Sequence, residues 1–220
     1  MLCGANIEVG RGVLAALEGP NGAGKTTMLR IFATLVSPQS GRATVDGFDV
    51  TRSGARVRER IGVAFVNERS LYWRLSGREN LMVFARMRGL GKRAAAREVD
   101  ELLEELDLTR FAASWVSDLS AGQRQRLVVA RASLGEPSCM LVDEPLRGLD
   151  EAATAMVVTL LASRARAGAA VLVATPKLEE LQGYADVCYR LWDGSVEPWP
   201  VGEEPTGDVR EREQMEMLAQ

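Results

Sequence analysis

The sequence predicts an α/β fold in which a mainly parallel β-sheet is covered by helices and a helical block is inserted, and three observations support it. Short apolar runs alternate with segments of helical periodicity on both sides of the middle of the chain. A glycine-rich turn separates the first apolar run from a helical segment. Residues 76–117 show helical periodicity without a strand pattern. Strands that alternate with helices imply parallel pairing, because each helix returns the chain to the same end of the sheet.

The expected elements follow from these patterns. Strands are expected over residues 13–18, 43–45, 61–66, 139–142, 170–175 and 187–192. Helices are expected over residues 26–34, 120–134, 151–167 and 177–184. Apolar residues at helical spacing mark further helices in the middle block, namely Leu81, Phe84 and Ala85, and then Val99, Leu102, Leu103 and Leu106.

The chain of 220 residues is long enough for one well-packed core. We therefore expect a single domain over residues 1–200, followed by a polar C-terminal tail. The expected segments are a core over 1–67 and 119–200, a helical subdomain over about 68–118, and a tail over 201–220. The tail is expected to be mobile, or to form a helix whose Met215 and Leu218 pack weakly.

The amino-acid composition excludes several classes of function. Hydrophobic residues make up 46% and charged residues 26% of the chain, as in ordinary soluble globular proteins. The net charge of -3 argues against binding nucleic acid through bulk charge, so no nucleic-acid partner is expected. The chain contains no histidine, which excludes proton transfer or metal binding by an imidazole.

The cysteines and the hydropathy pattern predict a cytoplasmic protein. Cys3, Cys139 and Cys188 do not have the spacing of metal ligands, and two of them lie in strand-like runs, so buried free thiols are expected. No apolar run approaches the ~18–20 residues needed to cross a bilayer. We therefore expect any membrane contact to come through a partner.

The first candidate site is the glycine-rich turn. Its spacing, glycine, four residues, then Gly-Lys-Thr between a strand and a helix, is typical of a P-loop. Backbone N–H groups of such a loop surround phosphates, Lys25 reaches the β- and γ-phosphates, and the hydroxyl of Thr26 binds Mg²⁺. The alternative is a glycine-rich turn that only leads into a helix. The expected nucleotide-binding residues are Gly19, Pro20, Asn21, Gly22, Ala23, Gly24, Lys25, Thr26 and Thr27.

Two further motifs accompany this loop. Asp143 and Glu144 end an apolar strand, where buried carboxylates are costly unless they face a cation, so Asp143 is expected to hold Mg²⁺. The alternative is a pair of helix-capping acids before Pro145. Ser120, Gly122 and Gln123 stand at a helix start, where a serine caps the helix with the same N–H groups that can bind an anion.

Together, the stretches Gly19–Thr27, Leu119–Leu127 and Cys139–Glu144 resemble the ATP-binding cassette (ABC) transporter family, over about residues 4–198. The resemblance implies the ABC ATPase fold, with its P-loop NTPase core, and a subunit that binds and hydrolyses ATP with Mg²⁺. It implies that Glu144 is the general base for the attacking water. It also implies that two cassettes, identical or different, enclose ATP, so that Ser120, Gly122 and Gln123 serve the nucleotide of the other subunit.

The resemblance further implies an integral membrane transporter subunit as partner, with this chain on the inner face of the membrane. The segment over 69–75 is expected to form part of the groove for a cytoplasmic helix of that subunit, with Leu71 and Leu75 in the subdomain core. The segment from Asn67 to Asn80 is most similar to exporter subfamilies. The turn before Asp150 is similar to the one that crosses the dimer interface, but Asp150 is equally expected as a helix N-cap.

Three positions depart from the family pattern. Pro176 stands where a histidine is usual, Val66-Asn67 stands where a glutamine is usual, and no aromatic residue precedes the first strand to stack on adenine. These departures leave an alternative, a degenerate cassette that binds ATP and completes a partner's site but hydrolyses poorly. A soluble ABC ATPase acting on ribosomes or DNA is disfavoured, because those forms usually have two cassettes or long coiled-coil insertions.

Overall fold

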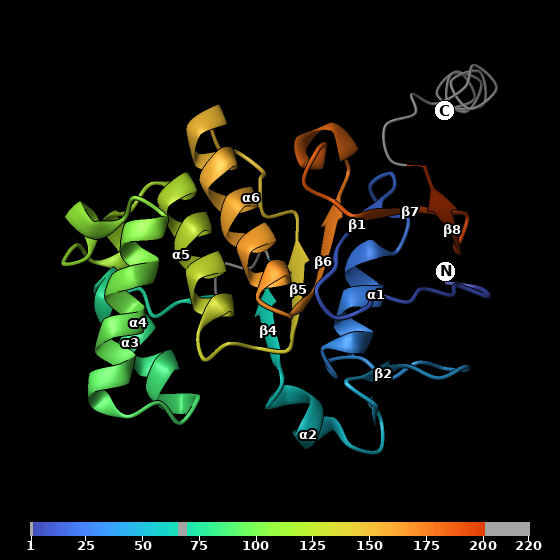
Figure 1. Ribbon diagram of the computed structural model, residues 1–220, viewed down its shortest axis with the longest axis horizontal. Coiled ribbons are helices and arrows are strands. Elements are labelled where there is room, and N and C mark those ends of the chain that lie inside the picture. The colour runs from blue at the N-terminus through green and yellow to red at the C-terminus, as the bar shows by residue number, and fades with distance from the viewer. Residues whose placement is uncertain (1, 66–69, 201–220) are drawn as a thin grey trace.

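The computed structural model describes residues 2–65 and 70–200, and its centre is a six-stranded sheet (Figure 1). The strand order is β4-β5-β6-β1-β7-β8, in which all neighbours pair in parallel except β7 and β8. The strands are β1 (Leu14–Glu18), β4 (Ile61–Ala64), β5 (Cys139–Asp143), β6 (Ala170–Thr175), β7 (Val187–Trp192) and β8 (Ser195–Trp199). The predicted α/β fold with a mainly parallel sheet is confirmed.

Helices cover both faces of the sheet. One face packs against α5 (Ala121–Ser133) and α6 (Glu151–Arg166), and the other against α1 (Lys25–Phe32) and α2 (Gly54–Arg58). The strands supply the two cores alternately, because successive side chains point to opposite faces. In β1, for example, Leu14 and Ala16 belong to the first core, and Ala15 and Leu17 belong to the second.

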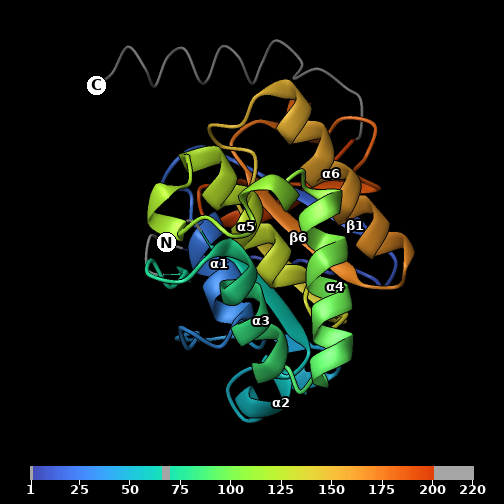
Figure 2. The same cartoon turned by 90° about the vertical axis from the view of Figure 1, so that its left-hand side faces the viewer.

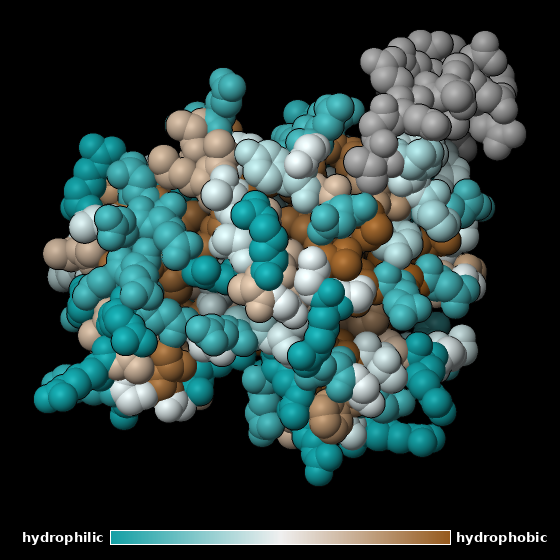
Figure 3. Space-filling view, in the orientation of Figure 1, coloured by the Kyte–Doolittle hydropathy of each residue, from teal (hydrophilic) through white to brown (hydrophobic). Residues whose placement is uncertain are grey.

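The middle of the chain forms a helical block beside the β4 edge of the sheet. It contains α3 (Gly77–Met87) and α4 (Lys92–Glu105), followed by two short 3₁₀ turns at Thr109–Phe111 and Val116–Asp118. Figure 2 shows α3 and α4 in front of the sheet, and the part of their surface that is visible in Figure 3 is mostly hydrophilic. The boundaries 1–67, 68–118 and 119–200 stay predictions, and residues 201–220 lie outside the described residues.

Two β-hairpins were not predicted, although the sequence of each contains a typical turn motif. β2 (Thr44–Val45) pairs with β3 (Phe48–Asp49), and β7 pairs with β8. Each hairpin turns through an Asp-Gly pair with positive φ at both residues, Asp46-Gly47 and Asp193-Gly194. Such two-residue turns match the twist of antiparallel strands, and Asp-Gly between apolar runs is their usual sequence.

Other element predictions need smaller corrections. The helix expected over 177–184 is a 3₁₀ turn at Leu178–Leu181, which ends before Gly183 adopts a φ of 79°. The strand expected over 61–66 is described only as Ile61–Ala64, and residue 66 lies outside the described residues. The short α2 was not predicted. Of the cysteines, Cys188 is buried and Cys139 is half-buried, but Cys3 is exposed.

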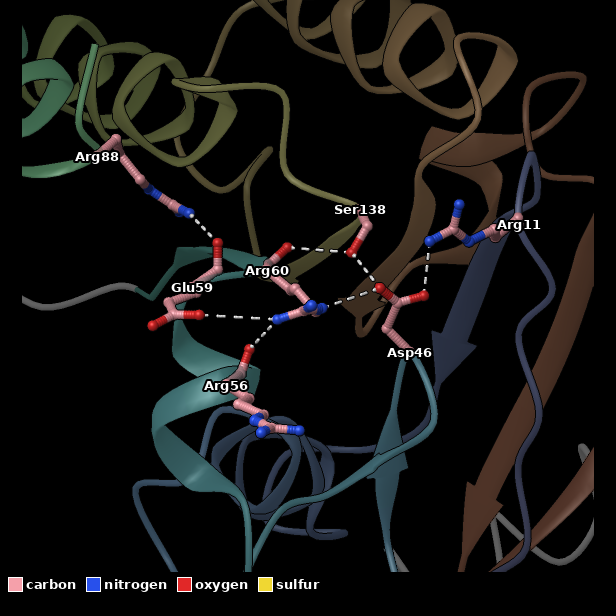
Figure 4. Close-up of polar contacts among 7 residues, drawn as sticks. All are labelled: Arg11, Asp46, Arg56, Glu59, Arg60, Arg88 and Ser138. Carbon is pink, nitrogen blue, oxygen red and sulfur yellow. Dashed lines mark hydrogen bonds and ion pairs between the residues drawn. The ribbon is translucent and has the colours of Figure 1, made fainter.

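Polar contacts fix the hairpin and the edge strand at the amino ends of the sheet (Figure 4). Asp46, in the β2–β3 turn, accepts a hydrogen bond from Arg11 at 2.6 Å and pairs with Arg60 at 3.2 Å. The hydrogen bond from Arg11 lowers the pKa of Asp46. Along the free edge of β4, Arg88 donates to the carbonyls of Glu59 and Ile61. Edge carbonyls of a strand would otherwise pair with water or another strand.

No helix among residues 2–65 and 70–200 has both the length and the apolar character needed to span a bilayer.

Candidate nucleotide-binding and catalytic site

The glycine-rich loop lies between the end of β1 and the start of α1, as predicted. Gly22 and Gly24 have φ of 86° and 111°, in the left-handed region that favours glycine. A Cβ at Gly19 would lie 2.4 Å from the carbonyl oxygen of Leu191, so no larger residue fits there. Gly24 caps α1 without a side-chain hydrogen bond, which leaves the first N–H groups of the helix available for an anion.

Lys25 is held inside this loop. Its side chain is buried, and Nζ donates to the carbonyl oxygens of Gly19 at 2.5 Å and Pro20 at 3.0 Å. Burial lowers the pKa of Lys25, and the nearby carboxylates of Glu144, Glu18 and Asp143 partly oppose this. The ammonium group therefore lies in the loop that would surround a phosphate, and carbonyl oxygens hold it there.

Thr26 and Asp143 meet although they are far apart in the sequence. The hydroxyl of Thr26 donates to Oδ2 of Asp143 at 2.8 Å, while Oδ1 of Asp143 is buried without a hydrogen-bond partner. Burial raises the pKa of Asp143, and the Thr26 hydrogen bond opposes this. Mg²⁺ prefers oxygen ligands, and this site offers a hydroxyl oxygen beside a carboxylate whose second oxygen is unpaired. These residues therefore fit a Mg²⁺ ion.

Glu144 follows at the same edge of the sheet. Its φ is 44°, and its N–H donates to the carbonyl of Ala174 in β6 at 2.8 Å. The amide of Gln125, from α5, donates to its backbone carbonyl at 3.4 Å. The carboxylate pairs with Arg147 at 3.4 Å. The register of β5, β6 and β1 brings Asp143, Ala174 and Leu17 side by side, so Glu144 lies at the strand ends that also carry the phosphate loop.

Ser120 and Gln123 form a capping box at the start of α5. The N–H of Gln123 donates to Oγ of Ser120 at 3.2 Å, and the N–H of Ser120 donates to the Gln123 side chain at 2.8 Å. The helix-cap interpretation of Ser120 is therefore confirmed. A Cβ at Gly122 would lie 3.3 Å from Leu149, so the turn before α6 packs closely on this helix start. Asp150 is the N-cap of α6 and accepts from Ala153 at 2.8 Å.

Comparison with known proteins agrees with this geometry. The sequence model of the ABC transporter family matches residues 2–147. This chain belongs to the ABC transporter family. The ATP-binding subunit of an ABC transporter has a TM-score of 0.83 with it at 28% identity, over 96% of this chain and 86% of the other. The dimeric bacterial ABC transporter cassette MJ0796 has a TM-score of 0.82 at 26% identity, over 92% and 91% of the two chains. ATP binding and the ABC ATPase fold follow from this membership.

Two relatives share more sequence with this ABC chain. The daunorubicin resistance ATP-binding protein DrrA3 of Streptomyces coeruleorubidus is 41% identical over 185 residues, which are 84% of this chain. The ABC transporter ATP-binding protein NatA of Bacillus subtilis is 34% identical over 191 residues, covering 87% of this chain and 78% of its own length. The match spans only 58% of the length of DrrA3.

The structure describes two of the three places where the sequence analysis expects this ABC chain to depart from the family pattern. Pro176 is exposed after β6, and the Thr175 hydroxyl accepts from the N–H of Lys177 at 3.0 Å and donates to its carbonyl at 3.1 Å. This tight turn offers no donor from Pro176 itself. Before β1, an aliphatic residue packs on the phosphate loop, since a Cβ at Gly24 would lie 3.0 Å from Leu2. Residues Val66, Asn67 and Glu68 lie outside the described residues.

Sequence reasoning missed two residues of this ABC site, Arg147 and Gln125. The contact of Arg147 could have been found, because it is three residues from Glu144 in a turn. The contact of Gln125 depends on how α5 packs against β5 and had no local signal. On the same helix, Arg124 and Arg126 donate to the carbonyls of Leu119 and Leu106.

Replacing Asp143 by asparagine is expected to raise the free energy of unfolding of the nucleotide-free protein by on the order of 1 kcal/mol at neutral pH. Because burial raises the native pKa, Asp143 is protonated to a greater extent in the native state than in the unfolded state, and its own contribution to stability falls as pH rises from the ordinary carboxyl pKa of 3.8. The advantage of asparagine is present above the native pKa and is lost below pH 3.8.

Urea unfolding at neutral and acidic pH measures this difference. Asp193→Asn is the matched control, because Asp193 is exposed and asparagine tolerates its φ of 45°. A stability loss in Asp143→Asn at neutral pH would contradict the prediction.

Proposed function

We propose that this chain is the ATP-binding and ATP-hydrolysing subunit of an ABC transporter, which dimerises around ATP to drive a membrane partner. The observation that carries the proposal is the convergence of three groups at one edge of the sheet. These are the phosphate loop with buried Lys25, the Thr26–Asp143 pair and the carboxylate of Glu144.

The phosphates of ATP would bind to the N–H groups of the loop over 19–27. Lys25 would exchange its carbonyl partners for β- and γ-phosphate oxygens, since a charged oxygen is a stronger acceptor than a carbonyl. Thr26 and Asp143 would hold Mg²⁺, which would neutralise part of the negative charge of the phosphates. A cation bound at this site would also offset the free-energy cost of burying the Asp143 carboxylate.

Hydrolysis would use Glu144 as general base. The oxygen of a water molecule forms the new bond to the γ-phosphorus, the bond from that phosphorus to the ADP oxygen breaks, and the water proton passes to the Glu144 carboxylate. Pro176, in the turn after β6, has no donor to offer this carboxylate, and we propose that turnover is low for this reason.

A second cassette would complete the site. The solved cassette MJ0796 is a dimer, and a further MJ0796 dimer in a post-hydrolysis state holds ADP and phosphate at a TM-score of 0.81 and 25% identity. By analogy, Ser120, Gly122 and Gln123 of one subunit would contact the γ-phosphate held by the other. Ser120 is exposed, so a partner can reach it.

The membrane partner would dock on the helical side of the chain, near the expected groove over 69–75. Tyr72 and Trp73 are 50% and 40% exposed, and Trp115, which bridges to Ser76, is 59% exposed. Exposed aromatic residues are enriched at protein interfaces. The subunit would then lie on the inner face of the membrane. The similarity to the daunorubicin resistance protein DrrA3 supports a role in export.

Lys25→Ala is expected to weaken ATP binding at least ~10-fold and to abolish ATP-dependent dimerisation, because the phosphates lose a buried cation. Lys92→Ala, which changes an exposed lysine at the start of α4, is the matched control. Fluorescent-nucleotide titration measures affinity, light scattering measures dimers and phosphate release measures turnover. The proposal fails if the wild type does not bind ATP, or if Lys25→Ala binds it equally well.

A further inference from the structure

A cation stands next to the carboxylate that we propose as general base. Nη1 of Arg147 lies 3.4 Å from Oε2 of Glu144, in the turn between β5 and α6. The Arg147 side chain is 74% exposed and that of Glu144 is 21% exposed. An exposed arginine therefore pairs with a carboxylate that is mostly covered. Across residues 2–65 and 70–200, Arg147 is the one ion-pair partner of Glu144.

The backbone around this pair is held in place. The left-handed Glu144 is tied to β6 through Ala174, and the carbonyl of Glu144 also accepts from the N–H of Arg147 at 3.4 Å. Leu146, between the two charged residues, is 3% exposed and anchors the turn in the core. Because both Cα positions are fixed, the freedom that remains in the Glu144 carboxylate is that of its own side-chain torsions.

Within residues 2–65 and 70–200, no hydrogen bond reaches the Glu144 carboxylate from the end of the neighbouring strand β6. β6 ends at Thr175, whose hydroxyl is engaged with Lys177, and the next residue is Pro176. Proline has neither an N–H nor a side-chain donor. The ion pair that the structure shows for the carboxylate is with Arg147, in the turn that follows Glu144 itself.

We propose that Arg147 is a positioning residue, whose guanidinium holds the Glu144 carboxylate where it accepts a proton from the attacking water. The inference rests on the proposed function, because it requires Glu144 to act as base. A carboxylate held in one orientation raises the rate of the chemical step without binding the substrate more tightly. An arginine that instead bound the nucleotide would change ATP affinity.

The test compares full-length wild type, Arg147→Ala, Arg147→Lys, and both Arg147 variants on a Glu144→Gln background. Arg97→Ala is the matched control, because Arg97 is 76% exposed and pairs with Glu101 at 3.7 Å in α4, outside the site. Steady-state and single-turnover phosphate release give kcat and KM, and nucleotide titration gives the ATP Kd independently of turnover.

We expect Arg147→Ala to lower kcat about 5- to 10-fold and to change KM and Kd less than about twofold. Arg147→Lys should recover part of the rate, and Arg147→Ala should have no further effect once Glu144 is glutamine. The proposal is overturned if kcat is unchanged, if ATP affinity falls as much as kcat, or if the Arg147 effect persists in Glu144→Gln. Two other results would overturn the proposed hydrolytic function, and this proposal with it. One is a Glu144→Gln variant that is as active as the wild type, and the other is a wild type without turnover.

Discussion

Glu144→Gln is expected to lower ATP turnover at least ~100-fold, the usual contribution of a general base, and to leave ATP binding unchanged. Glutamine has the same shape as glutamate and keeps the backbone bonds to Ala174 and Gln125, but it cannot accept the proton of the attacking water. The phosphate loop, Lys25 and the Thr26–Asp143 pair are untouched by this change. Single-turnover phosphate release and nucleotide titration on the same preparations measure the two quantities.

Glu104→Gln is the control for this experiment, because Glu104 is an exposed residue of α4 away from the strand ends. Equal single-turnover rates for Glu144→Gln and the wild type would show that Glu144 is not the base. A loss of ATP affinity in Glu144→Gln alone would show that the carboxylate serves binding rather than proton transfer.

Arg131→Ala is expected to lower the free energy of unfolding by about 2–4 kcal/mol, because it leaves two part-buried carbonyl groups without donors and removes a largely buried side chain. Arg131, on α5, donates to the carbonyls of Val63 at 3.0 Å and of Ser70, and its guanidinium lies 5.1 Å from the ring centre of Phe84. Burial lowers the pKa of Arg131 to about 10, and the charge of Arg88 acts in the same direction. The residue therefore joins the edge strand β4, α3 and α5 through one desolvated group.

Arg131→Lys should lose an intermediate amount, since an ammonium group lacks the planar fork that reaches two carbonyls. Arg93→Ala, an exposed substitution in α4, should stay within about 0.5 kcal/mol of the wild type. Urea unfolding followed by circular dichroism gives the free energies. An Arg131→Ala variant as stable as Arg93→Ala would show that water replaces the guanidinium at little cost.

The sequence predicted the site best where the signal is local. The phosphate loop, the capping serine Ser120 and the cap Asp150 depend on residues within a few positions of one another, and cap chemistry needs little from the rest of the fold. The signal for the Asp-Gly hairpin at 193–194 was equally local, but no strand was expected after residues 187–192. The helix expected over 177–184 was wrong because Gly183 ends the turn early.

Contacts between distant segments could not be predicted in the same way. The hydrogen bond between Thr26 and Asp143 joins residues 117 positions apart in the sequence, and it depends on β1 and β5 both flanking β6. Alternation of strands and helices predicts parallel pairing but does not specify the order of strands in the sheet. The donors that reach the carbonyls of β4 from Arg88 and Arg131 have the same origin, because β4 is an edge strand only in this order.

The sequence by itself determined the α/β class, the phosphate loop and the pair of acids at a strand end, because spacing and residue type are enough for these. The tertiary structure alone decided which oxygen of Asp143 stays without a partner, how Lys25 is held and which cation faces Glu144. The physical reason is that burial, and with it the cost of an unpaired charge or polar atom, is a property of packing between segments far apart in the chain.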